Sequence, residues 1–65
     1  MAMNFKDVKN KPLLKINDVN WFHNNLHLIF NWTMPLKISI QIKNEKYVEF
    51  DSIDAKYMFL LRWQC

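Results

Sequence analysis

A strict alternation of apolar and polar residues runs through residues 36–42. The apolar members are Leu36, Ile38, Ile40 and Ile42, and the polar members between them are Lys37, Ser39 and Gln41. Successive side chains of a β-strand point to opposite faces, so this period is typical of a strand with one buried face and one wet face. The stretch predicts a sheet, and the other segments are interpreted by how they cover its apolar face.

The chain has 65 residues, which is the size of one small domain spanning residues 1–65. A chain this short buries only about 60% of its unfolded surface, so a partner would help to stabilise it. Cys65 is the sole cysteine, which excludes an internal disulfide and favours a reducing compartment. The first residues lack the apolar core of a signal peptide, and no window approaches the roughly 18 apolar residues of a membrane span. We therefore expect a cytoplasmic protein with no membrane partner.

The positive charge is concentrated near the N-terminus. The net charge is +3, and residues 1–15 hold four lysines and one aspartate, whereas charges balance in residues 16–65. Residues 1–11 are interpreted as a basic arm or leader. Such an arm either is simply solvated or lies along a phosphate backbone or an acidic partner.

Glycine is absent, while asparagine occurs eight times. Asparagine is the next best residue for a positive φ, so we expect turns at asparagines. Residues 12–16 predict a short strand, because proline suits the first position of a strand. Asn17 and Asp18 would then form a turn that places Ile16 opposite Val19.

Residues 19–32 fit two different structures. A hairpin that turns at residues 24–25 would put most of the apolar side chains on one face. A helix would instead gather the polar side chains within one arc of roughly 100°. Those polar residues are Asn20, His23, Asn24, His27 and Asn31. The segment has no Ala, Glu or Lys and is rich in middling to poor helix formers, so composition favours the hairpin. Pro35 ends either version.

Residues 43–46 are a polar turn before a second alternating segment, residues 47–50. A two-residue loop would place the Glu49 carboxylate opposite Ile40 on the apolar face. A loop of three or five residues keeps Val48 and Phe50 on the same face as Ile40. We predict the odd loop, because a slip of one residue exchanges the two faces of a strand.

Residues 52–64 predict a helix. Ser52 can cap its N-terminus, and Asp51 and Asp54 suit the positive end of the helix dipole. A strand is the alternative, since aromatic and leucine residues alternate over 57–63. The helix would be apolar almost all round, so it is either buried or presents a second apolar face to a partner. The whole pattern predicts an α+β fold, with a small antiparallel β-sheet or partly closed barrel of about five short strands and a C-terminal helix.

Residues suited to chemistry are few. His23 and His27 have the i, i+4 spacing of metal ligands, but a tetrahedral site needs further ligands and no Cys or acidic cluster accompanies them. Ser39 lies in the middle of a predicted strand, Ser52 is a predicted cap, and Cys65 is the last residue, so none is placed like an activated nucleophile. We expect no enzyme, no metal site and no cofactor.

The leading functional hypothesis is a small protein-binding module. Ten aromatic residues other than histidine in 65 are more than so small a core hides easily, and aromatic residues are enriched at interfaces. The richness in Asn, Lys, Ile and Phe resembles the bias of AT-rich genomes, including those of many phages. The hypothesis is an inhibitor or adaptor from a phage or mobile element that occludes a target protein. Its candidate contact residues are Trp32, Met58, Phe59 and Trp63.

The alternative hypothesis is a small basic nucleic-acid-binding module of the β-barrel type, which would use lysines together with stacking aromatic side chains. Its candidate contact residues are Lys9, Lys11, Lys15, Lys37, Lys43, Trp21 and Phe22. A third hypothesis is a homo-oligomer whose apolar faces cover one another.

Overall fold

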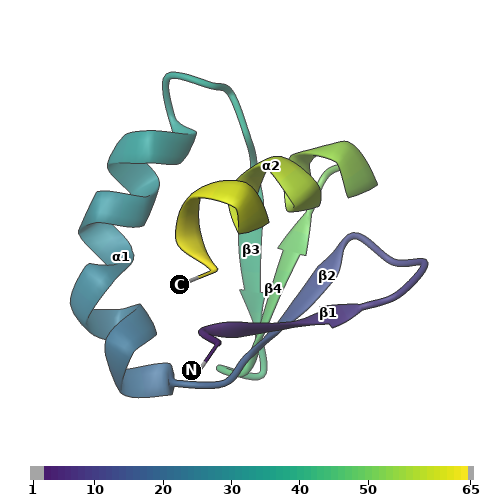
Figure 1. Cartoon of the computed structure of the whole chain (residues 1–65). Coiled ribbons are helices and arrows are strands. Elements are labelled where there is room, and N and C mark those ends of the chain that lie inside the picture. Colours follow the sequence, from purple (N-terminus) through teal and green to yellow (C-terminus); the bar gives the residue numbers. More distant parts are fainter. Residues whose placement is uncertain (1–2, 65) are drawn as a thin grey trace.

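The computed structural model describes residues 3–64, which form four strands and two helices. Their order is β1 (Phe5–Val8), β2 (Leu13–Ile16), α1 (Val19–Thr33), β3 (Ile40–Lys43), β4 (Tyr47–Phe50) and α2 (Ile53–Trp63). The strands form one antiparallel sheet in the order β1-β2-β4-β3 (Figure 1). The predicted α+β class and C-terminal helix are confirmed. The sheet is open rather than a partly closed barrel, and it has four strands rather than about five.

The chain uses the order strand, strand, helix twice, first as β1-β2-α1 and then as β3-β4-α2. The two halves join between β2 and β4. There the Ile16 N–H donates to the Lys46 carbonyl and the Phe50 N–H donates to the Pro12 carbonyl, both at 2.7 Å. Each helix begins after a two-residue connection from one of these central strands. The central pair therefore sets where both helices start.

Residues 19–33 are helix α1, so the preference for a hairpin in this segment was wrong. The Asp18 side chain caps the helix by accepting a hydrogen bond from the Trp21 N–H at 3.0 Å. The five polar residues expected on one arc of a helix are all exposed, whereas Phe22 and Ile29 are buried. Burial of this apolar stripe outweighs the weak intrinsic helix propensity of the segment, as tertiary packing commonly does.

The strand expected over residues 36–42 begins only at Ile40, so the prediction was wrong for its first four residues. Lys37 and Ile38 instead form the turn that terminates α1 after Thr33. The Ile38 N–H donates to the Thr33 carbonyl at 3.1 Å, and the Lys37 N–H donates to the Met34 carbonyl at 3.0 Å. These two hydrogen bonds, together with the φ of 58° at Lys37, form a Schellman motif at the C-terminus of the helix. β3 is thus a short edge strand rather than the centre of the sheet.

The loop between β3 and β4 has three residues, 44–46, as the parity argument predicted. Ile40 lies opposite Phe50 and Ile42 lies opposite Val48, so the apolar side chains share one face. Asn44 has a φ of 52°, in agreement with the expected use of asparagine in turns.

Residues 5–8, within the segment expected to be a basic arm, form edge strand β1. Phe5 is buried at 1% exposure. Its N–H donates to the Gln64 side-chain oxygen at 3.0 Å, and the Asn4 N–H donates to the Gln64 carbonyl at 3.1 Å. These bonds hold the start of β1 against the end of α2, and Figure 1 shows these two segments close together.

The core lies between one face of the sheet and the two helices. Its buried apolar members are Phe5, Leu14, Ile16, Val48 and Phe50 from the strands, and Phe22, Ile29, Ala55, Phe59 and Trp63 from the helices. The Phe59 ring centre lies 5.2 Å from that of Phe5 and 5.1 Å from that of Phe50. Aromatic pairs at these separations attract one another beyond simple burial. The molecule therefore has two layers, and the opposite face of the sheet carries no helix of residues 3–64.

Candidate interaction surfaces

Helix α2 begins as predicted, with the Ser52 hydroxyl accepting a hydrogen bond from the Ala55 N–H at 3.1 Å. One side of the helix packs on the core. That side consists of Ala55, Lys56, Phe59 and Trp63, all of which are buried. The spacing of these residues places the other side of the helix towards solvent.

The solvent side of α2 is also apolar. Its large side chains are Ile53, Tyr57, Met58 and Leu61, which are 40%, 46%, 47% and 90% exposed. We call these four residues the outer α2 face. Ile53, Tyr57 and Leu61 follow one another at four-residue spacing, so they form a continuous stripe along the helix. Contiguous exposed apolar side chains of this kind mark interaction surfaces.

The four residues predicted to bind a protein fall in different environments. Phe59 is fully buried and Trp63 is 6% exposed, so both are part of the core. Trp32 is partly buried, with its ring centre 6.1 Å from that of Phe59. Met58 lies on the outer α2 face. Ile53, Tyr57 and Leu61 were not among the predicted contact residues, although their i, i+4 spacing in the predicted helix indicates a stripe.

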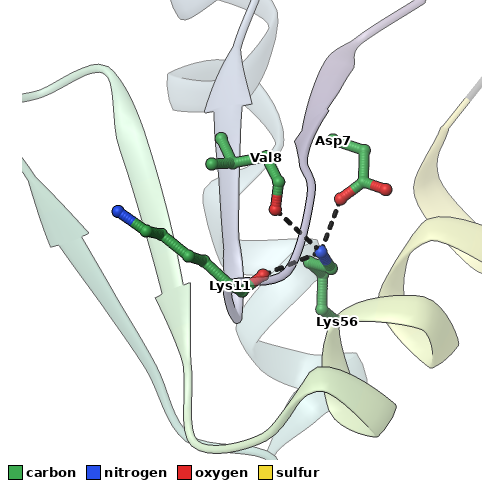
Figure 2. A network of polar contacts seen from close by, with 4 residues as sticks. All are labelled: Asp7, Val8, Lys11 and Lys56. Carbon is green, nitrogen blue, oxygen red and sulfur yellow. Dashed lines mark hydrogen bonds and ion pairs between the residues drawn. The ribbon is translucent and has the colours of Figure 1, made fainter.

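Lys56 is a lysine with no exposed surface. Its ammonium group donates to the Asp7 carboxylate and to the carbonyls of Val8, at 3.2 Å, and Lys11, at 2.8 Å (Figure 2). An ammonium has three N–H donors, and here each has an acceptor. The group ties α2 to the turn between β1 and β2, across 45 to 49 residues of chain. We interpret Lys56 as a structural residue, because its donors are all used within the fold.

The face of the sheet opposite the helices carries a line of basic side chains. Lys6 lies directly opposite Lys15, Lys15 lies opposite Tyr47, and Tyr47 lies opposite Lys43. The row thus crosses the strands in the order β1-β2-β4-β3. All three lysines are exposed, and Tyr47 is half-buried between two of them. We call Lys6, Lys15, Tyr47 and Lys43 the lysine row.

The residues predicted to bind nucleic acid are divided by the fold. Lys15 and Lys43 lie in the lysine row. Lys9 and Lys11 are exposed in the turn between β1 and β2, and Lys37 is exposed at the end of α1. The predicted stacking residues do not join them, because Phe22 is buried in the core and Trp21 packs against it. Lys6 and Tyr47 were not among the predicted contact residues, and strand pairing places both beside Lys15.

The residues considered for chemistry are dispersed. His23 and His27 are exposed on α1, and Ser52 caps α2. Ser39 lines a polar pocket of about 160 Å³ together with Gln41, Glu49, Phe50 and Asp51. That volume is below the roughly 300–1,000 Å³ of most ligand pockets. No group of three or more metal-ligating side chains occurs within residues 3–64, and Cys65 lies outside the described residues.

Comparison with known proteins finds no matching protein-family model, curated protein or solved structure. Neither helix in the described part of the chain has the length and apolar character needed to cross a membrane. The two surfaces from which a function is inferred are the outer α2 face and the lysine row.

Proposed function

We propose that this protein acts by binding another protein through the outer α2 face. The observation that carries the proposal is Leu61, a leucine that is 90% exposed at the C-terminal end of an apolar stripe. Fully burying such a side chain contributes roughly 1.5–3 kcal/mol relative to leaving it in water. A protein partner that covers the stripe would recover this free energy.

The stripe is not needed to cover the core, because α2 already buries its opposite side. A helix with anchors at i, i+4 and i+8 suits an apolar groove on a partner. The charged residues beside the stripe, Asp54 and Arg62, are exposed and would lie at the rim of such an interface. This geometry supports docking of the outer α2 face on a partner.

The mechanism that fits a chain of this size is occlusion. A small rigid module with one docking helix can cover a functional surface of a larger protein, as an inhibitor or an adaptor does. The proposed setting is the cytoplasm, or the host cytoplasm if a phage or mobile element encodes the chain. The supporting features are the sole cysteine and the AT-rich residue bias.

The proposal is tested by affinity capture from nuclease-treated lysate of the source organism or its host. The wild-type chain is compared with Leu61→Ser. We expect one protein to be retained in stoichiometric amount by the wild type and to be reduced at least about tenfold with Leu61→Ser, because a buried apolar anchor contributes more than 1.4 kcal/mol.

Met34→Ser is the matched control, since Met34 is 71% exposed but lies beyond the end of α1. This variant should retain the protein as the wild type does. Equal retention by all three baits would contradict the proposal. A third outcome is recovery of the bait alone, together with a wild-type dimer in sedimentation equilibrium that Leu61→Ser dissociates. The partner of the outer α2 face would then be a second copy of this chain.

A further inference from the structure

The lysine row is a second surface, separate from the outer α2 face, and it differs in chemistry. From it we infer a further function, the binding of single-stranded nucleic acid on the open face of the sheet. This inference goes beyond protein binding and does not depend on it, because α2 lies on the opposite side of the sheet.

The positive charge of the lysine row favours the binding of an anion. Lys6 and Lys15 are direct cross-strand neighbours, and like charges in this position repel one another. The ion pairs within residues 3–64 are Lys43–Glu49 and Lys56–Asp7. Lys6 and Lys15 therefore have no carboxylate within salt-bridge distance in the described chain. A phosphate backbone along the row would relieve their repulsion and release condensed counterions.

Tyr47 favours nucleic acid over other anionic polymers. It lies between Lys15 and Lys43 on neighbouring strands and is partly exposed. Proteins that bind single strands combine lysines along the backbone with an aromatic side chain on which a base stacks. The row crosses three inter-strand intervals, or about 14 Å, which is enough for a short run of nucleotides.

The same arrangement favours a single strand over a duplex. A duplex hides the faces of its bases, so Tyr47 would have nothing to stack on. Proteins that recognise base edges in a duplex usually insert a helix or a β-ribbon into the major groove and often use arginine. The sole arginine of the chain, Arg62, is on α2, and the row lies on an open sheet face. Glu49 lies opposite Gln41 and forms an ion pair with Lys43, so the unpaired positive charge of the row is that of Lys6 and Lys15.

Fluorescence anisotropy with a labelled 15-nucleotide oligo(dT) tests the inference. If the three lysines contact phosphates, the affinity of the wild type should fall about 20-fold as salt rises from about 50 to about 200 mM. The double variant Lys6→Gln/Lys15→Gln should bind more weakly, and its slope of log K against log salt should be smaller by about 1.4. Tyr47→Leu should weaken binding roughly tenfold or more, since it removes the stacking surface.

The matched control is Lys37→Gln/Arg62→Gln, which removes the same charge from exposed residues outside the row. It should bind oligo(dT) nearly as tightly as the wild type. Circular dichroism confirms that each variant is folded. Equal weakening by both double variants would overturn the inference, because binding would then follow net charge alone. Absence of binding at about 50 mM salt, or equally tight binding of a 15-base-pair duplex or of polyglutamate, would also overturn it.

Discussion

Replacing Lys56 with methionine is expected to lower the free energy of unfolding by roughly 3–5 kcal/mol. Methionine fills a similar volume but donates no hydrogen bond. The Asp7 carboxylate and the carbonyls of Val8 and Lys11 would all lose their shared donor. A chain of 65 residues has a total stability of about 3–10 kcal/mol, so the variant should lose roughly a third or more of it. Urea unfolding followed by circular dichroism measures the loss.

The control for this prediction is Glu49→Gln, which breaks the surface ion pair between Lys43 and Glu49. Their side chains are 51% and 39% exposed, and the charged atoms are 3.2 Å apart. We expect a loss of less than about 1 kcal/mol, because exposed ion pairs contribute little. If Lys56→Met is no more destabilising than Glu49→Gln, Lys56 does not hold the β1–β2 turn against α2.

Replacing Phe59 with alanine is expected to cost roughly 3–5 kcal/mol. Phe59 is fully buried, and its ring lies among those of Phe5, Phe50, Trp32 and Trp63. Removal of the ring leaves a cavity that rigid aromatic neighbours fill poorly, so the cost includes lost contacts as well as lost burial. The midpoint of urea unfolding reports the change.

Met58→Ala is the matched control for Phe59→Ala, because Met58 is the adjacent residue of α2 and is 47% exposed. This variant should change stability by no more than about 0.5 kcal/mol. The contrast between adjacent residues tests the orientation of α2 about its own axis. A large loss with Met58→Ala and a small loss with Phe59→Ala would mean that the helix presents the opposite side to the core.

Local rules predicted residues 43–64 well. Ser52 was recognisable as a cap because a polar residue precedes good helix formers and Asp54. The odd loop before β4 followed from parity, since the other choice puts Glu49 on the apolar face. These features depend on residues close together in sequence, which is why pattern arguments found them.

The parts that failed depend on contacts distant in sequence. Helix α1 has poor intrinsic propensity, and its stripe of Phe22 and Ile29 is stabilised by the sheet and α2. The start of the alternating stretch joined the end of α1, because Lys37 adopts a positive φ that the pattern does not reveal. The sequence pattern of residues 5–8 did not predict strand β1, because this strand is held by its pairing with β2 and by bonds to the end of α2.

The candidate surfaces were only partly predictable for the same reason. The sequence suggested that α2 has a second apolar face, but it did not say which side packs on the core. The frequency of aromatic residues at interfaces favours them as contacts, yet Phe59 and Trp63 fill the core. The lysine row needs the register of four strands, which fixes Lys6 beside Lys15 and Tyr47 beside Lys43.

The most direct test of the central claim is site-specific photo-cross-linking, with benzoylphenylalanine in place of Leu61 on the outer α2 face or in place of Gln41 on the open face of the sheet. Both positions are exposed. In nuclease-treated lysate, we predict that the probe at position 61 forms one dominant protein adduct, whereas the probe at position 41 forms none. A dominant protein adduct from position 41 and none from position 61 would contradict the account, because the docking surface would then be the sheet and not α2.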